Sequence, residues 1–499
     1  MNTENEATMR GSHLRLSRCL GRAFFLLVQT GLAMCLCDPT LFSQQAPWVA
    51  PSLPGGQKHV LYSSPDLLTK PFYVGKVEGF SVAKHPPTVV FSYLPGQDYR
   101  PRKAGPVMLG VWSHWGQGTV INGKYYVGYG DHTQTGRIAE WDPETGESRV
   151  VVDVSKFLNL PKEYYRPGKV HSYLTLGKDG WLYYSTGDEV PDGYIYNGDW
   201  IMRTRLETGK TEIVAQGPAG PYSVPNGFAD PERMIYFGTG EQQSVFFAYD
   251  LVNRRLLYKS PLGEGGDRGM PYAQSTGRIY YRGNMQEPYL RRLDNLLPEM
   301  ADFIGHESPH PWGIMRRWDV KSGEVVEIKT ECNPRAATRE TGDGVIWIAT
   351  YGGKLWKLDV ATETFTPVAN LAVMSQSYIT SLVRDSTGRY LYYSPGAHGT
   401  ACNDGTPIFQ YDVKTGKVKA ICFLTPATLN MGLGYICAGT FGMAISEDDS
   451  TLFVTWNGFR PAFHDLTTSL TTPWSSGEIH SWDVCAVTAI RIPPEERIP

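Results

Sequence analysis

An internal repeat limits the folds that this sequence can adopt. Residues 112–132, WSHWGQGTVINGKYYVGYGDH, align without a gap on residues 169–189, KVHSYLTLGKDGWLYYSTGDE, when their Asn-Gly and Asp-Gly turns are superposed. The alignment places His114 on His171, so polar side chains recur at equivalent points of the repeat. Repeats of this kind indicate a fold built from copies of one supersecondary unit.

A second recurring feature is a short turn, most often an aromatic residue and Asp followed by two residues and Thr-Gly. This turn is typical of a tight hairpin between two strands. It recurs seven times along the chain, as WDPETG at 141–146, RLETG at 205–209, YDLVN at 249–253, WDVKSG at 318–323, LDVAT at 358–362, YDVKTG at 411–416 and WDV at 482–484. Seven four-stranded units of roughly 40 to 70 residues predict an all-β fold, a seven-bladed β-propeller of antiparallel blades.

Composition supports this fold class, because 53 Gly, 35 Pro, 29 Tyr and 13 Trp with only 19% charged residues favour short strands and tight turns. A solenoid would need a more uniform period, and a set of sandwiches would need linkers. The two helix candidates, residues 156–165 and 291–303, both fall in connections.

The first 45 residues differ from the rest of the chain. Several arginines precede the apolar run AFFLLVQTGLAMCLC at 23–37, which predicts an export signal and is short for a membrane span. Cleavage near Ser43, lipoprotein processing before Cys35 and an uncleaved anchor remain alternatives. Residues 46–107 are Pro-rich and read as a lead-in that wraps the propeller and donates a strand, and residues 108–495 form the propeller. We therefore expect a protein that is periplasmic or extracellular, with no integral span in the mature chain.

The charge pattern limits the kinds of binding partner that we expect. The net charge is −3 and no basic run is present, so nucleic acid and anionic membranes are not expected partners. We expect a monomer.

Candidate site residues occupy two positions of the repeat. In a propeller, the loop before the innermost strand and the loop after the second strand open on the same face. Residues at these two positions, or beside them, are His114, Trp115, His171, Tyr173, Asn226, Arg268 and Arg335 for the first and His132, Glu189 and His398 for the second. Each histidine could instead be a satisfied structural group, Arg335 a clamp between blades, and Glu189 a loop cap.

Histidines and arginines around one axis suit β-elimination beside a carboxylate. In that reaction a cation neutralises the carboxylate, a base removes the adjacent proton, and an acid protonates the leaving oxygen. We assign the first role to Arg268 and Arg335, the second to His114 or His171, and the third to Tyr173 or the other histidine. Trp115, like other aromatic residues here, is a candidate for stacking on a sugar ring.

Residues 113–132 and 169–187 resemble the seven-bladed propeller polysaccharide lyases, especially the ulvan lyases and more distantly the oligogalacturonate lyases. The resemblance extends by pattern over residues 108–495. It implies cleavage of a uronic-acid polysaccharide such as ulvan, with His114 and His132 as the histidine pair.

The resemblance is incomplete at the next two family positions. It implies a tyrosine, for which Tyr173 is the candidate, and an arginine about 16 residues later, where this chain has Glu189. Arg268 or Arg335 would then act from across the channel, with Asn226 and Trp115 as further substrate contacts.

His398, Cys402, Cys437 and Cys332 form a second constellation, because thiolates and imidazole are good zinc ligands. A zinc or calcium ion is therefore predicted and no organic cofactor is expected. A Cys402–Cys437 disulfide and simply buried thiols are the alternatives. The five cysteines beyond the signal are an odd number, so at least one is a free thiol or a metal ligand.

The function predicted from these residues is an exported lyase that cleaves an acidic polysaccharide. Two alternatives remain: a non-catalytic propeller that binds glycan or protein, and a different propeller enzyme. The latter would be a hydrolase or a streptogramin-lyase-like enzyme, since residues 347–368 resemble the blades of that last family.

Overall fold

The computed structural model describes residues 51–71, 79–98, 112–131, 135–187, 193–240, 245–265, 269–283, 314–397, 399–459 and 484–497. The chain divides into two units, Met1–Pro47 and Trp48–Pro499, and every described residue belongs to the second. The predicted export signal at 1–45 lies outside the described residues. Within the described part, no helix is long and apolar enough to cross a membrane.

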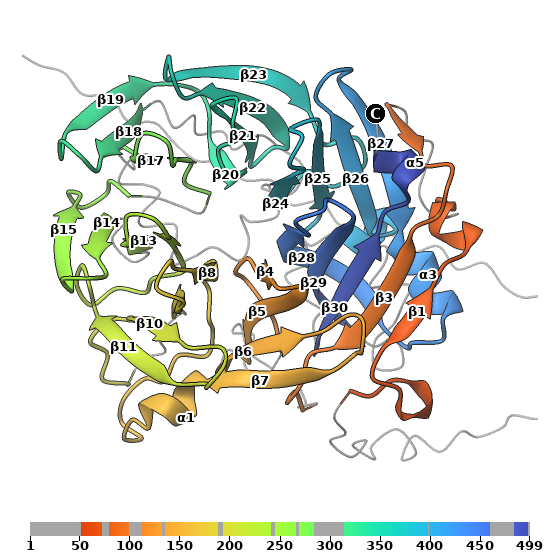
Figure 1. Ribbon diagram of the computed structural model, residues 1–499, viewed down its shortest axis with the longest axis horizontal. Coiled ribbons are helices and arrows are strands. Elements are labelled where there is room, and N and C mark those ends of the chain that lie inside the picture. Colours follow the sequence, from red (N-terminus) through yellow and green to blue (C-terminus); the bar gives the residue numbers. More distant parts are fainter. Residues whose placement is uncertain are drawn as a thin grey trace, which may run out of the picture. The chain divides into compact units, whose positions relative to one another are not determined.

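The described strands form seven sheets around a common centre, which confirms the all-β, seven-bladed β-propeller (Figure 1). Each of the first six blades consists of four consecutive antiparallel strands. Blades one to three are β4 (Thr119–Ile121), β5 (Lys124–Gly130), β6 (Gly136–Trp141) and β7 (Ser148–Asp153); β8 (Thr175–Leu176), β9 (Leu182–Ser185), β10 (Trp200–Thr204) and β11 (Thr211–Gln216); and β12 (Asn226–Asp230), β13 (Ile235–Gly240), β14 (Val245–Asp250) and β15 (Arg255–Lys259). Blades four to six are β16 (Tyr272–Ala273), β17 (Arg278–Arg282), β18 (Ile314–Asp319) and β19 (Val325–Lys329); β20 (Pro334–Ala337), β21 (Val345–Thr350), β22 (Lys354–Asp359) and β23 (Thr364–Asn370); and β24 (Ile379–Arg384), β25 (Tyr390–Pro395), β26 (Pro407–Asp412) and β27 (Lys417–Phe423).

Blade seven is assembled from both ends of the described chain. Its first three strands are β28 (Ile436–Ile445), β29 (Thr451–Phe459) and β30 (Val484–Arg491), and its fourth is β3 (Thr88–Tyr93). β3 pairs antiparallel with β30 through six residue pairs, from Thr88↔Arg491 to Tyr93↔Ala486. The ring is therefore closed by backbone hydrogen bonds between distant segments.

Two more strands from the lead-in extend the outer edges of neighbouring blades. β1 (Val60–Tyr62) pairs antiparallel with β3, and β2 (Phe80–Val82) pairs in parallel with β27. One interpretation of the turns was wrong: Val484 begins the third strand of blade seven, so the run at 482–484 does not join strands three and four. No hairpin is needed there, because the fourth strand comes from β3.

Helices are few and short in the described chain: α1 (Val154–Leu158), α3 (Leu424–Asn430), α5 (Pro494–Arg497), and the 3-10 turns η2 (Pro54–Gly56), η3 (Pro65–Leu68) and η6 (Ala401–Asp404). Only the start of the helix predicted at 156–165 forms. The Asp153 side chain accepts a hydrogen bond from the Lys156 N–H and caps α1, and Asn159 ends it in a left-handed conformation. The other predicted helix, 291–303, lies outside the described residues.

The hairpin turns owe their recurring Asp to a backbone contact. Asp412 Oδ1 accepts the N–H groups of Lys414 at 2.9 Å and Thr415 at 3.3 Å. Asp142 in blade one makes the same contacts with the next turn residues, also at 2.9 and 3.3 Å. Gly416 ends its turn at φ 68°, a left-handed conformation that glycine adopts without steric cost. The recurring sequence is thus a local device that reverses the chain after each third strand.

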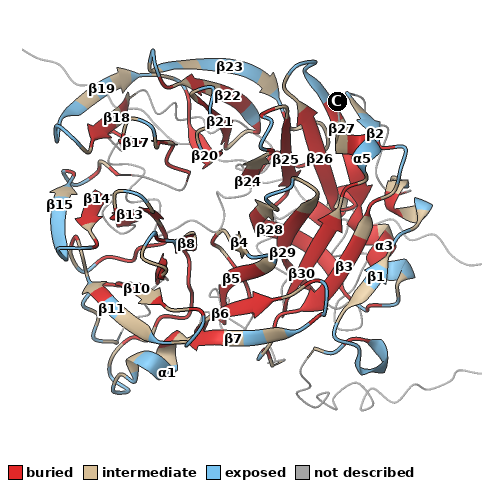
Figure 2. Ribbon diagram, viewed as in Figure 1, coloured by how far each residue is buried: buried red, intermediate tan, exposed pale blue. Residues whose placement is uncertain are grey.

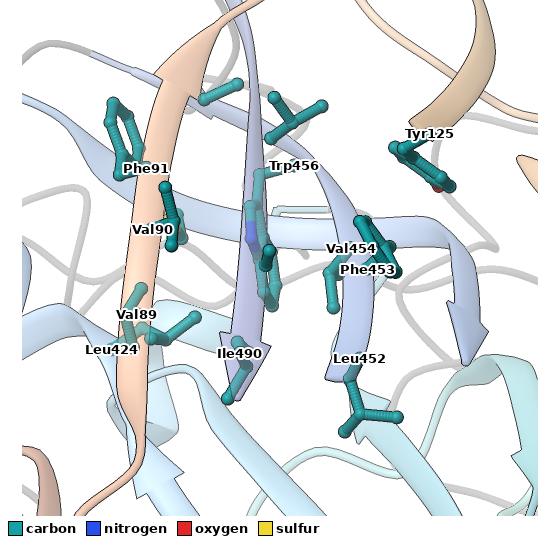
Figure 3. Close-up of a cluster of buried hydrophobic side chains, with 14 of the residues drawn as sticks. Val89, Val90, Phe91, Tyr125, Leu424, Leu452, Phe453, Val454, Trp456 and Ile490 are labelled. Carbon is teal, nitrogen blue, oxygen red and sulfur yellow. The ribbon is translucent and has the colours of Figure 1, made fainter. Parts of the chain in front are cut away.

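The largest hydrophobic cluster lies where the ring closes. Figure 3 shows Val89, Val90 and Phe91 of β3 beside Trp456 and Ile490 of the same sheet. All five are at most 3% exposed. Figure 2 shows that burial is concentrated in the inner strands of the blades, whereas outer strands such as β15 and β19 are largely exposed. The fourth strands β3 and β27 are more buried, because β1 and β2 cover their outer edges.

Turns between first and second strands also connect neighbouring blades. They lie on the face opposite the loops that lead into the innermost strands. An Arg233 Nη donates to the Gln274 carbonyl at 2.8 Å, joining blades three and four, and the Ser275 N–H donates to Glu340 at 2.8 Å, joining four and five. The Ser386 N–H donates to Asp449 at 2.9 Å and joins blades six and seven. These polar contacts fix each blade against the next one along that face.

We predict that Phe91→Ala lowers the free energy of unfolding by about 3–5 kcal/mol, because removal of a buried ring leaves a cavity at the closure. Phe91 is fully buried and lies 5.5 Å from Tyr435, ring centre to ring centre. Urea unfolding measures the effect. Leu61→Ala on β1, where Leu61 is 52% exposed, is the control and should change stability little. Equal effects of the two substitutions would contradict the closing role of β3.

A second prediction concerns Asp412, which a bidentate pair joins to Arg389 through two contacts of 2.8 Å. Although partial burial opposes it, hydrogen bonds from Arg389 and the turn lower the pKa of Asp412 to about 2. This contribution to stability is present above the ordinary value of 3.8 and is lost as pH falls through about 2. Asp412→Asn should therefore destabilise the protein at neutral pH, and progressively less on acidification.

Asp142→Asn is the matched control for that experiment, since the turn geometry is the same and no ion pair with arginine is found for Asp142 among the described residues. Urea midpoints between neutral pH and pH of about 2 should separate the two variants only at the higher pH. A constant difference across that range would show that the arginine pair is not responsible.

Candidate functional site

The predicted axial residues divide into those that the structure describes and those that it does not. The described ones are His114, Trp115, His171, Tyr173, Asn226 and Arg335. His132, Glu189, Arg268 and His398 lie outside the described residues, so their assignments stay predictions.

Trp115 contacts residues of three blades. It lies in the loop that leads into β4, on the face that carries the loops before the innermost strands, here called the axial face. Its ring stacks on His171 with centroids 5.6 Å apart and an interplanar angle of 23°, and it lies 4.5 Å from the ring of Phe441 on β28. Lys169 Nζ lies 4.5 Å from the centre of the same Trp115 ring. The indole N–H donates to Ser113 Oγ at 2.9 Å, which fixes the ring orientation. One partly exposed aromatic ring therefore contacts a cation, an imidazole and the innermost strand of blade seven.

Close backbone packing makes this arrangement possible. A β-carbon on Gly116 would lie 2.2 Å from the Ser172 carbonyl oxygen, and one on Gly442 would lie 2.7 Å from the Gly116 carbonyl oxygen. Both separations are shorter than side chains tolerate, so glycine is required at these positions. Blades seven, one and two consequently approach each other directly around Trp115.

His171 is held at the boundary of blades two and three. It is 3% exposed, and its Nδ1 is hydrogen-bonded to the Pro225 carbonyl. Because a carbonyl oxygen only accepts, Nδ1 carries the proton, and a neutral ring then has an unprotonated Nε2. That tautomer is the one in which Nε2 can accept a proton.

Tyr173 follows His171 and is anchored to blade three. Its backbone N–H donates to the Gly227 carbonyl at 2.9 Å, and its ring stacks on Phe228 with centroids 6.1 Å apart. Asn226 begins β12 beside this contact and is 3% exposed. Tyr173 therefore contacts Phe228 of the next blade, and its predicted role in the site stays a prediction.

His114 occupies the equivalent repeat position and has a different environment. It is fully buried, and Asn457 holds its backbone on both sides, through contacts of 2.8 Å to the N–H and 3.1 Å to the carbonyl. The Phe441 N–H donates to His114 Nε2 at 3.4 Å. Burial lowers the pKa of His114 from 6.5 to about 3 despite hydrogen bonds to backbone carbonyls. The ring is therefore neutral and its Nε2 lone pair is engaged, which suits a framework residue better than a general base.

Arg335 is enclosed by aromatic rings. It is 2% exposed, and its Nε donates to the Tyr378 hydroxyl at 2.7 Å. Its guanidinium carbon lies 4.9 Å from the centre of the Tyr378 ring and 5.7 Å from those of Tyr351 and Phe441. Cation–π contacts of this kind stabilise a cation taken out of water. Arg335 therefore joins blades five, six and seven through contacts to aromatic rings.

Three of the four predicted metal ligands, Cys332, Cys402 and Cys437, lie among the described residues. The five cysteines that the structure describes are buried free thiols, so Cys402 and Cys437 form no disulfide. Cys332 packs in a hydrophobic cluster of blades four and five, whereas Cys402 packs against Ile436 of blade seven. Burial raises the pKa of the Cys402 thiol to about 12, and metal binding requires the thiolate. Among the described residues no group of three or more metal-ligating side chains is found. The zinc or calcium ion remains an untested prediction.

Comparisons with known proteins show neither a family nor a function for this chain. No family model and no curated protein matches the sequence. Among solved structures, the chain is similar to one in "Crystal Structure of Mitotic Checkpoint Complex", with a TM-score of 0.46 and 10% identity over 85% of this chain and 98% of that chain. It is also similar to one in "Crystal structure of Nidogen/Laminin Complex", with a TM-score of 0.37 and 14% identity over 59% of this chain and 92% of that chain. Neither likeness is close enough to support a function.

Sequence reasoning missed Lys169 and Phe441. Lys169 precedes His171 by two residues, so the alternation of an extended segment was a usable signal. Phe441 lies in the middle of β28, and nothing in the repeat pattern distinguishes it from other buried aromatic residues.

We predict that replacing His114 makes stability less dependent on pH. Its folded-state pKa of about 3 is below the ordinary 6.5, so the unfolded chain binds the extra proton and stability falls as pH drops below about 6.5. Between neutral pH and about pH 5, wild type should lose about 2 kcal/mol that His114→Gln does not lose. Urea unfolding at several pH values measures this, and identical pH dependence in both proteins would contradict it.

Proposed function

We propose that this chain cleaves an acidic, uronic-acid-containing polysaccharide, such as ulvan, by β-elimination at the axial face around Trp115. The observation that carries the proposal is the state of His171: its Nδ1 is bonded to the Pro225 carbonyl, which leaves Nε2 as the basic nitrogen. The resemblance of residues 113–132 and 169–187 to ulvan lyases supports the same reaction.

In the proposed mechanism His171 Nε2 removes the proton next to the sugar carboxylate. A nearby cation must neutralise that carboxylate, because the negative charge that develops on it would otherwise oppose proton removal. Tyr173, which lies two residues beyond His171, is proposed to protonate the leaving oxygen. His114 supports this site through Phe441 and is not given a chemical role. His132 remains a proposed catalytic histidine, and Glu189 and Arg268 remain proposed contacts to substrate.

The second candidate is a propeller that binds an acidic glycan without cleaving it. The small exposed fractions of His171, 3%, and Arg335, 2%, favour this alternative. A general base must come within hydrogen-bond distance of the proton that it removes, either directly or through one water molecule. A binding surface needs only the partly exposed groups at the rim, such as Trp115 and Tyr173.

We also propose that the chain acts outside the cytoplasm as a monomer. The arginines and the apolar run of residues 10–37 support export, and Cys35 would be the attachment point if the chain is instead processed as a lipoprotein.

The test is incubation of the purified protein with a panel of uronate polysaccharides while ultraviolet absorbance of the unsaturated product is followed. Wild type should give a rise with at least one substrate. His171→Ala should reduce turnover by about 100- to 10,000-fold, the usual contribution of general base catalysis. His85→Ala is the control, because that half-exposed histidine contacts Glu496 of α5 and not the Trp115 cluster.

Absence of any rise with folded wild type would rule out the lyase. If calorimetry then shows that wild type binds an acidic oligosaccharide, the second candidate replaces the first. A His171→Ala protein that turns over normally would remove His171 from the mechanism.

A further inference from the structure

Three polar side chains lie on the segment that leads into β8. Lys169 and His171 flank Val170, which forms a β-bridge with Thr186, so their side chains lie on the same side of the chain, and a bend at Ser172 separates them from Tyr173. The Trp115 ring is 4.5 Å from Lys169 Nζ and 5.6 Å from the His171 ring centre. A positive charge and the proposed base are thus both held against one aromatic ring.

Arg335 is a second cation near Trp115, because its guanidinium lies over Phe441, which contacts the Trp115 ring. Its surroundings differ from those of Lys169. Its guanidinium is 2% exposed, lies over three rings and donates to Tyr378. Movement of Arg335 toward a sugar would break contacts that join blades five, six and seven. Lys169 is 8% exposed and contacts the partly exposed Trp115 from a flexible side chain.

We propose that Lys169 binds the anionic substituent of the sugar and that Trp115 positions it, an inference that rests on the proposed function. The ammonium supplies the positive charge that β-elimination needs beside the base. It also gives the axial face a preference for acidic over neutral sugars. The arginine that the family resemblance leads one to seek, at the place of Glu189, is then replaced by a lysine from the segment that carries His171.

The chemistry of lysine sets the class of ligand. An ammonium is a compact point charge with three rotatable donors, whereas guanidinium prefers the planar, bidentate geometry of a carboxylate. Lys169 should therefore bind a carboxylate or a sulfate on a pyranose ring. The two sources are distinguished by testing a uronate oligosaccharide, its methyl ester and a sulfated oligosaccharide without uronate.

The experiment compares affinities of wild type, Lys169→Met and Lys169→Arg for these three oligosaccharides by calorimetry. Wild type should bind the free acid more tightly than the ester, and Lys169→Met should lose about 10- to 100-fold in affinity for the acid while its affinity for the ester is kept. Lys169→Arg should restore most of the preference. The ratio of acid to ester affinity is informative because a purely structural role of Lys169 would not change it.

Lys210→Met is the matched control. Lys210 Nζ also lies over a tryptophan, 5.6 Å from the Trp181 ring centre, but it is 64% exposed and belongs to the hairpin between β10 and β11 of blade two. Its replacement should leave all three affinities unchanged. Urea unfolding confirms that each variant is folded. If Lys169→Met does not fold, Lys169→Gln replaces it in the comparison.

The outcomes separate this inference from the function on which it rests. If wild type binds the acid and Lys169→Met keeps the same acid-to-ester ratio, Lys169 is not the recognition group while the proposed function stands. If folded wild type binds none of the three, the proposed function itself fails. If Lys169→Met loses affinity only for the sulfated oligosaccharide, Lys169 binds sulfate. Its proposed role beside the scissile bond is then overturned.

Discussion

The pairing of β3 with β30 is the interaction on which the rest of the structure depends. A propeller gives every blade two neighbours only if the last blade is joined to the first, and here six residue pairs between residues 88–93 and 486–491 complete that blade. The hydrophobic cluster behind them includes Val90, Phe91 and Trp456, all fully buried. Because the ring is closed, blade seven presses against blade one, which brings Phe441 against Trp115.

The closed ring of blades also explains why histidines at equivalent repeat positions have different hydrogen-bond partners. His114 and His171 share one position of the repeat, but each faces a different neighbour. Asn457 and Phe441 of blade seven bury His114 and engage its Nε2, whereas Pro225 engages Nδ1 of His171. Equivalence in a repeat places two residues at corresponding points of the fold. The adjacent blade then decides which nitrogen is hydrogen-bonded, Nε2 in His114 and Nδ1 in His171.

The architecture was accessible from sequence because its signal is local. The Asp that recurs in most of the hairpins acts within four residues, as Asp412 does with Thr415, so these turns could be counted directly. The fourth strand of blade seven and the partners of Arg335 depend on contacts between segments far apart in the chain, which a repeat alignment does not encode. The zinc prediction stays untested, and residue type alone could not show that Cys332 and Cys402 pack in separate clusters.

The most direct measurement of the central claim is a structure of this protein with an acidic oligosaccharide bound. The expected result places the sugar on the axial face, with its anionic group within hydrogen-bond distance of Lys169 Nζ and the acidic C–H directed at His171 Nε2. A sugar bound at the outer edge of a blade, or on the face of the turns between first and second strands, would contradict both the site and the reaction proposed for it.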